Sequence, residues 1–328
     1  MAQRKIENEL ELLDALRNAP ADVAFAGLRK ALADRVNLMV AKASRIAAAR
    51  HIPELTPDLL KAFDGLLKHP DRDPQCAAKI ELAKSLIEIG YSSSEPFLRG
   101  SLHVQMEPVW GARVDTAVPL RGICVLGLVQ ANDMPRSEVL RRLVHALADK
   151  EHPVRIDAVR ALEQMGGGEC ELLLRLKALQ GDREPQVTGQ AIESVLRLES
   201  APSLSFAASF LASTQDGVRE EAALALGASH VPGAVEILKR ALSEAHEESF
   251  RRAILTAIGA SREEGAIEFL FGLLQNGISP DAEGSLEALA LERHNPELVA
   301  RVEKIVRDRA VRRLQERFDA LFAQSRRD

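Results

Sequence analysis

Apolar residues recur at helical spacing in two related phrases that lie far apart in the chain. The phrases are HPVRIDAVRALEQMG (152–166) and DGVREEAALALGASH (216–230), and both contain V-R-x-x-A-x-x-A-L. Counted from Val154 and Val218, mostly small or apolar residues stand at offsets 4, 7, 8 and 11. This spacing places them on one stripe of an α-helix. The pattern therefore predicts an amphipathic helix in each phrase.

The same template fits eight segments, each preceded by another short amphipathic segment such as 137–150 or 233–245. The eight segments begin near residues 36, 78, 118, 154, 187, 218, 250 and 282. Each unit is thus expected to be a hairpin of an A helix and a B helix. Because one hairpin cannot bury its apolar stripe alone, neighbouring hairpins must stack. The sequence predicts one all-α array over 22–295, in place of the two domains that length alone suggests.

The two ends of the chain have helical patterns of their own. Residues 1–21 are expected to supply an N-terminal capping helix, and 296–328 a much longer C-terminal helix. Apolar residues continue at helical spacing to Phe318, Leu321 and Phe322. This stripe either caps the last hairpin or mediates a homodimer.

One connection departs from the repeat, because an insertion at 104–116 separates an A helix from the B helix that begins near Thr116. It carries Trp110, the single tryptophan in a chain that has only ten Phe and one Tyr besides. Polar residues cluster around the insertion: Arg99, His103, Gln105, Glu107, Arg113, Asp115 and Arg121. Long loops in compact arrays are often functional, and Trp and Arg are enriched at binding hot spots. The insertion is either a recognition site or a plug formed by Val109 and Trp110.

The B helices are expected to point offsets 3 and 6 away from the core, onto a concave face. These positions include Arg121, Asp157 and Arg160, and the face has mixed charge in its N-terminal half. A mixed surface suits a protein partner, whereas the alternative is a merely solvated face. Cys124 falls at an outward offset too, which leaves a reactive thiol as an option.

Composition narrows the function classes. The formal net charge is −5, which argues against a general nucleic-acid binder. No apolar run approaches the length of a membrane span, and the acidic N-terminal segment is unlike a signal peptide. Three widely spaced cysteines fit a reducing cytoplasm. The histidines and cysteines lack metal-ligand spacing, and no phosphate-binding or nucleophile motif occurs, so neither catalytic residues nor cofactors are expected.

The V-R-x-x-A-x-x-A-L phrases, with the acidic turns at Asp149, Asp182 and Asp216, resemble HEAT repeats. The units of 31–33 residues after Val154 are similar to the compact bacterial type named after phycobilisome lyases. The resemblance covers about residues 22–294. It implies a right-handed α-solenoid of about eight hairpins, and it says little about function because such repeats serve many unrelated proteins.

Three function classes follow from these observations. The preferred hypothesis is a non-enzymatic scaffold that binds a protein partner on the concave face and the 104–116 insertion. The second, implied by the resemblance alone, is a bilin-lyase-like subunit that handles a chromophore. The third resembles the HEAT-like alkylpurine DNA glycosylases, whose basic concave face and aromatic residues are at odds with this acidic chain and its single Trp.

Overall fold

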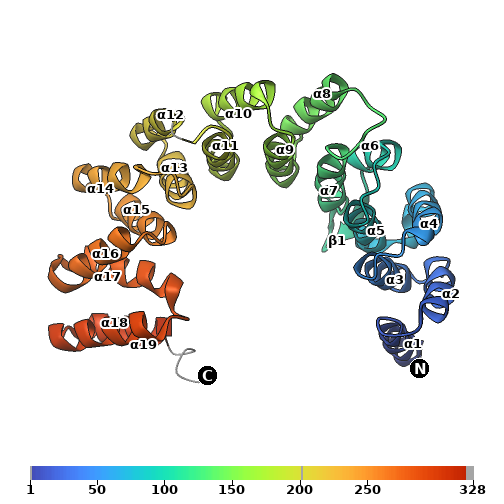
Figure 1. Ribbon diagram of the computed structural model, residues 1–328, viewed down its shortest axis with the longest axis horizontal. Helices are drawn as coiled ribbons and strands as arrows, with labels where there is room; N and C mark the ends of the chain where they lie inside the picture. The colour runs from blue at the N-terminus through green and yellow to red at the C-terminus, as the bar shows by residue number, and fades with distance from the viewer. Residues whose placement is uncertain (1, 201, 323–328) are drawn as a thin grey trace. The chain divides into compact units, whose positions relative to one another are not determined.

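The computed structural model describes residues 2–200 and 202–322, with the side chains of residues 2–6 left aside. It forms two compact units, Met1–Met165 and Gly166–Asp328, and each is described by itself. Both units are built almost entirely from helices (Figure 1). The expected all-α fold is confirmed, with one short β-hairpin as the exception among the described residues.

The first unit contains α1 (Ala2–Ala15), α2 (Ala21–Leu32), α3 (Asn37–Ala49), η1 (Pro53–Leu55), α4 (Thr56–Lys68), η2 (Pro70–Arg72), η3 (Pro74–Cys76), α5 (Ala77–Glu88), α6 (Glu95–Ser101), β1 (Met106–Val109), β2 (Ala112–Asp115), α7 (Val118–Leu128), α8 (Arg136–Leu147) and α9 (His152–Met165). Consecutive helices pair as hairpins, from α2 with α3 to α8 with α9. The B helices α3, α5, α7 and α9 pack side by side in chain order, and α1 lies against α3.

The second unit contains α10 (Gly168–Gln180), α11 (Pro185–Leu198), α12 (Leu204–Ser209), η4 (Phe210–Ala212), α13 (Asp216–Ala228), α14 (Ala234–Glu244), α15 (Glu248–Ala260), α16 (Glu264–Asn276), α17 (Ser279–Leu289), η5 (Ala290–Glu292), α18 (Pro296–Arg309) and α19 (Arg312–Phe322). The B helices α11, α13, α15, α17 and α19 again pack in chain order. Each unit therefore has two layers, one of A helices and one of B helices.

Small residues let neighbouring B helices approach closely. A Cβ atom added to Gly227 on α13 would lie 2.2 Å from the carbonyl oxygen of Ala257 on α15. Along α9, the template residues Val154, Ala158 and Leu162 are buried. Leucines thus fill the core where the two layers meet, and alanines and glycines stand where helices touch.

The arginine of the V-R phrase has a structural task. Arg251 donates to the carbonyl oxygens of Leu242 and Ala245, both 2.6 Å away at the end of the preceding A helix. Its other guanidinium nitrogens pair with Asp281 in the next hairpin. Arg155 donates in the same way to the carbonyl oxygen of Asp149, at 2.8 Å. The arginine satisfies carbonyls that a helix end leaves unpaired, and it can also tie successive hairpins together.

The register expected for the third hairpin is wrong by two residues. Val118 is expected at the first template position, but Leu120 is the fully buried residue there. Arg121 therefore takes the position of the V-R arginine and is buried, while Cys124 lies in the core. Burial raises the pKa of the Cys124 thiol, so the outward, reactive thiol is not found. The error arises because Val118 and Leu120 are both apolar and Pro119 lies between them.

The single long C-terminal helix is also not found. The chain turns at Ala310, which has a left-handed φ of 50°, and continues as α19. Helix α18 packs against α16 and α19 against α17, so this segment adds a further hairpin to the stack. Arg309 holds the turn by donating to the carbonyl oxygens of Leu274 and Gly277. Residues 323–328 of the expected helix lie outside the described part of the chain.

The apolar stripe of α19 acts as a cap. Phe318 and Phe322 are buried, with ring centroids 4.8 Å apart, and Leu314 is buried beside them. Arg313 and Arg317 pair with Glu283 and Glu287 of α17. The phenylalanine rings are therefore covered by their own unit, as expected of a cap on the last hairpin.

Candidate protein-interaction site

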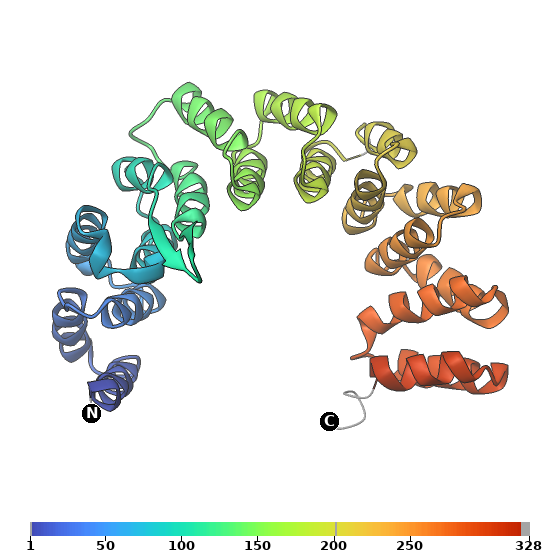
Figure 2. The ribbon, with the colours of Figure 1, turned by 180° about the vertical axis from the view of Figure 1, so that it is seen from behind.

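The insertion at 104–116 is a β-hairpin. Strands β1 and β2 are antiparallel, with Val109 opposite Ala112 and Met106 opposite Asp115. Trp110 and Gly111 form the two-residue turn and have φ values of 46° and 86°. Two positive φ values in a two-residue loop are typical of a type I′ turn, whose twist matches that of the strands. Figure 2 shows the hairpin standing out beside the helices of its own unit.

The tip of the hairpin is energetically unfavourable in two ways, through its backbone conformation and through its exposed apolar side chain. Type I′ turns favour Asn or Gly at the first position, and a bulky residue such as Trp110 is strained in the left-handed region. The Trp110 side chain is also fully exposed, at 103% of its reference area. Val109, Val114 and Met106 are exposed around it. An exposed apolar tip on a strained backbone favours a binding function over the plug, because a plug would be buried.

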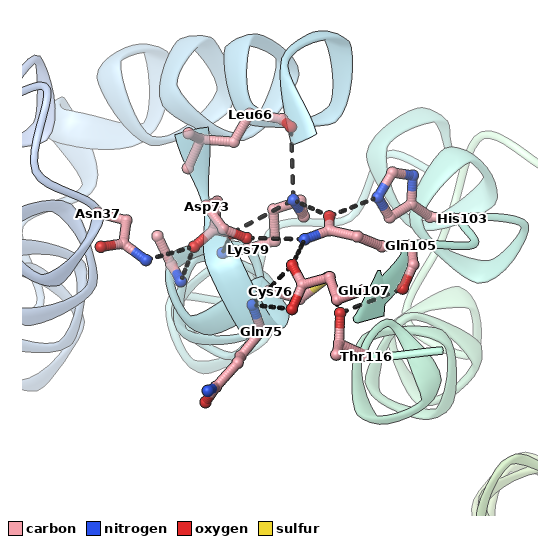
Figure 3. A network of polar contacts seen from close by, with 11 residues as sticks. Asn37, Leu66, Asp73, Gln75, Cys76, Lys79, His103, Gln105, Glu107 and Thr116 are labelled. Atoms are coloured by element: carbon pink, nitrogen blue, oxygen red, sulfur yellow. Dashed lines mark hydrogen bonds and ion pairs between the residues drawn. The ribbon is translucent and has the colours of Figure 1, made fainter. Parts of the chain in front are cut away.

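The base of the hairpin, by contrast, is anchored in a buried polar network (Figure 3). The side-chain oxygen of Gln105 accepts from Lys79 Nζ at 2.8 Å, and its amide donates to the carbonyl oxygen of Asp73 at 2.9 Å. The carboxylate of Glu107 accepts from the backbone N–H of Gln75 at 3.0 Å. The first strand is thereby tied to the turn before α5.

Lys79 and Asp73 form the centre of this network, and both are fully buried. Lys79 Nζ lies 3.4 Å from Asp73 Oδ2, and Asp73 also accepts from Asn37 and from the backbone N–H groups of Ala78 and Lys79. Buried charges are tolerated when they are paired and hydrogen-bonded in this way. The network joins α3, α5 and the hairpin, so the tip stands on a fixed base.

The second strand is anchored separately, through Asp115. Its carboxylate lies 2.6 Å from Arg121 Nη1, and Arg121 also donates to Asp149 at 3.1 Å and to the carbonyl oxygen of His103 at 3.1 Å. Burial alone would raise the pKa of Asp115. Hydrogen bonds from Arg121 and from the backbone N–H groups of Gln105 and Ala117 outweigh it and hold this pKa below its usual value.

The residues expected at the site thus separate into an exposed tip and a buried base. Trp110 and Arg113 are exposed, and the Arg113 guanidinium donates to the carbonyl oxygen of Met106 at 3.0 Å. Three of the expected partner-binding residues are buried instead: Gln105, Asp115 and Arg121. They support the hairpin, so the prediction that they lie on the binding surface is wrong. The sequence analysis grouped all of them because they lie close together in the chain, and closeness in the chain does not distinguish buried positions from exposed ones.

The remaining expected residues are half-buried or lie on other elements. His103 contacts Gln105, and burial lowers the pKa of its imidazole. Glu107 holds the base of the hairpin as described above. Arg99 pairs with Asp64 and Glu95.

Asp157 and Arg160 belong to α9. Asp157 lies against α7, since a Cβ atom on Gly122 would come 2.0 Å from its carboxylate, and burial raises the pKa of Asp157. Arg160 pairs with Asp157 at 3.4 Å. These two residues are part of the B-helix layer and do not contribute to the hairpin.

Exposed apolar residues beside the tip were missed at the sequence level. Leu102, Val104 and Val114 join Met106 and Val109 in this group. The signal was present, because apolar residues alternate with polar ones from Val104 to Glu107 and a glycine-containing turn follows. Among the described residues, no group of three or more His, Cys, Asp or Glu side chains is arranged to hold a metal ion.

Solved structures that match the chain are only weakly similar to it. No curated protein matches the chain. A structure of human deoxyhypusine hydroxylase with glycerol matches at 18% identity, over 79% of this chain and 99% of that one, with a TM-score of 0.31. An engineered protein matches at 17% identity, over 97% and 94%, with a TM-score of 0.35. Values this low carry no functional inference.

The family assignment comes from the sequence of the second unit and from the hairpins themselves. Residues 204–290, which run from α12 to η5, match the model of HEAT repeats. The same A and B hairpins, stacked through their B helices, extend to either side of this stretch within the unit and recur in the first unit. Residues 204–290 are thus assigned to the HEAT repeats, and the hairpins on either side of them have the same architecture.

Proposed function

We propose that this chain is a non-enzymatic scaffold that recruits a partner protein through the tip of the β1–β2 hairpin. The observation that carries the proposal is Trp110, fully exposed on a strained turn above a fixed base. Stacked repeats supply a rigid support, and repeat arrays commonly present binding surfaces. No feature of the described residues specifically favours chromophore handling or DNA repair.

The chemistry of the tip defines what the partner must offer. The Trp110 indole needs an apolar pocket, with a hydrogen-bond acceptor for its N–H. Arg113, on the neighbouring strand, favours a carboxylate at the rim of that pocket. Tryptophan and arginine are the residues most often found at the energetic centre of protein interfaces. A folded protein with an acidic-rimmed apolar pocket is therefore the expected partner.

The setting that we propose is the cytoplasm. The thiols of Cys76, Cys124 and Cys170 are buried, which suits a reducing compartment. Burial raises the pKa of the Cys76 thiol to about 11, so it resists oxidation. Separately, none of the helices in the described residues is both long and apolar enough to cross a membrane.

Trp110→Asn tests the proposal sharply, because Asn-Gly is the favoured type I′ pair and the hairpin should remain folded. Tagged wild-type and variant chains are used to capture partners from the source cell, and Leu12→Asn, at another exposed apolar position, is the matched control. A partner recovered with wild type and the control, but reduced at least tenfold with Trp110→Asn, is expected. Equal recovery with all three chains would refute the proposed site.

A second readout uses the single tryptophan of the chain. With a tryptophan-free fragment of the recovered partner, the emission of Trp110 should shift to shorter wavelength as the indole enters the pocket. An unchanged spectrum at saturating partner would show that binding occurs elsewhere.

A further inference from the structure

Helix α10, the first A helix of the second unit, carries apolar residues on two opposite faces. Cys170, Leu174 and Ala178 are buried against the unit. Leu172, Leu176 and Leu179 point the other way, and their side chains are 65%, 61% and 67% exposed. The outward face of a surface helix is normally polar, so an apolar stripe on that face is unusual. We call these three exposed leucines the α10 stripe.

Sister A helices in the same unit carry polar residues at these positions. The three A helices can be aligned on their fully buried leucines, which are Leu174, Leu238 and Leu270. In this alignment, the positions of the α10 stripe are occupied on α14 by Glu236, Arg240 and Ser243. On α16 they are occupied by Glu268, Gly272 and Gln275. All six of these residues are exposed. The fold of the repeat therefore does not require leucine there, and the stripe needs another explanation.

The spacing of the stripe is that of a coiled-coil seam. Leu172, Leu176 and Leu179 follow one another at four and three residues, as the a and d positions of a heptad do. Glu169 precedes Leu172 on the same seam and is exposed. The natural occupant of such a seam is another helix that carries the same kind of stripe.

Charge identifies that helix. Exposed Glu169 lies at the start of α10, and exposed Arg183 follows its end, so the two ends of the stripe have opposite charge. Arg183 lies beyond the last residue of α10, Gln180, so in an antiparallel pair centred on Leu176 the start of each helix, with Glu169, lies at the end of the other, near Arg183. The helix dipoles are then also antiparallel, whereas a parallel pair would bring like charges together. The stripe is thus complementary to itself.

We infer that the α10 stripe is a self-association surface, on which a second copy of this chain binds through an antiparallel α10–α10 contact with two-fold symmetry. Both copies use the same patch, as an isologous interface requires. The contact is small beside the roughly 800 Å² per partner of a stable complex, so the dimer should depend on concentration. This surface is separate from the hairpin, and the inference does not depend on the proposed function.

The first experiment is sedimentation velocity on the full chain up to about 100 µM, a range suited to interfaces of this size. Wild type should approach the mass of two chains as concentration rises. The variant Leu172→Glu, Leu176→Arg, Leu179→Ser carries the residues of α14, which that helix tolerates, and should dissociate at least tenfold more readily. A wild-type chain that stays monomeric overturns the inference, and so does a dimer that the triple variant leaves intact.

The second experiment tests the geometry by mild oxidation of single-cysteine additions. Leu176→Cys lies at the two-fold axis and should form a cross-linked dimer, because the native cysteines are buried. Leu172→Cys should not, since the two copies of residue 172 lie about 12 Å apart along an antiparallel pair. Preferential cross-linking through Leu172→Cys would overturn the antiparallel arrangement.

Discussion

Two connections between A and B helices, one in each unit, perform the same structural task with very different lengths of chain. Between α14 and α15 only Ala245, His246 and Glu247 intervene, and Arg251 covers the helix end and pairs with Asp281. Between α6 and α7 a whole β-hairpin intervenes. Arg121 still donates to the carbonyl oxygen of His103 and pairs with Asp149.

The comparison shows which parts of the insertion the fold uses. The short connection satisfies its helix end without a hairpin, so packing does not demand one. In the long connection, the arginine has one additional partner, Asp115, which lies at the base of the hairpin. The base is therefore integrated into the helical stack, whereas the tip with Trp110 contributes nothing to it. The absence of a packing role for the tip supports the proposed binding function.

The largest expected effect concerns the shared arginine. Arg121→Met leaves Asp115, which is buried, and Asp149 without their partner. Removal of one member of a buried ion pair typically costs about 3–5 kcal/mol of unfolding free energy. Urea denaturation followed by circular dichroism measures this loss of unfolding free energy. Arg141→Met, at a site with 69% of the side chain exposed, should change stability by less than about 0.5 kcal/mol. Similar costs for the two variants would contradict the structural role of Arg121.

The next effect is a pH dependence at Asp115, a residue without a counterpart in the short connection. The pKa of Asp115 lies below its ordinary value of 3.8 in the folded chain. Its contribution to stability is therefore present above that value and is lost as the pH falls through the lower folded pKa. Asp115→Asn should be less stable than wild type at pH 7, by about 1.5–3 kcal/mol. The two denaturation curves should converge in acid, and a constant difference down to the acid limit would contradict this assignment.

A smaller effect of opposite sign is expected at the tip. Trp110→Asn relieves a bulky residue of its left-handed conformation, which costs roughly 1–2 kcal/mol. The hairpin should therefore gain protection, measured as slower amide hydrogen exchange across β1 and β2. Gly111→Ala, which places a side chain at a φ of 86°, should have the reverse effect. Faster exchange in Trp110→Asn would mean that the indole stabilises the hairpin after all.

These contrasts also show what the sequence could predict. The repeat and its helices followed from apolar spacing, since that spacing decides which side chains can share a core. Apolar spacing alone could not reveal the correct register near Val118 or the turn at Ala310. Apolar residues at helical spacing continue across Ala310, and the break depends on tertiary contacts of Arg309.

The candidate site was located by its sequence, but its division into base and tip was not. Composition identified Trp110 and its polar neighbours as one cluster. The roles of Gln105 and Arg121 depend on partners such as Lys79 and Asp149, which lie 26 and 28 residues away in the chain. No local pattern reveals such pairs.

The smallest effect comes from a third connection, between α10 and α11, where Thr188 follows Val187 at the arginine position. Its hydroxyl oxygen is buried and lacks a hydrogen-bond partner in the described structure. Thr188→Val keeps the shape and removes the unpaired group, so it should stabilise the chain by about 1 kcal/mol. Ser261→Ala is the matched contrast, because that buried hydroxyl donates to the carbonyl oxygen of Ile258 at 2.7 Å and its loss should destabilise. If Thr188→Val also destabilises, the hydroxyl has a partner and this connection satisfies its polar groups as the other two do.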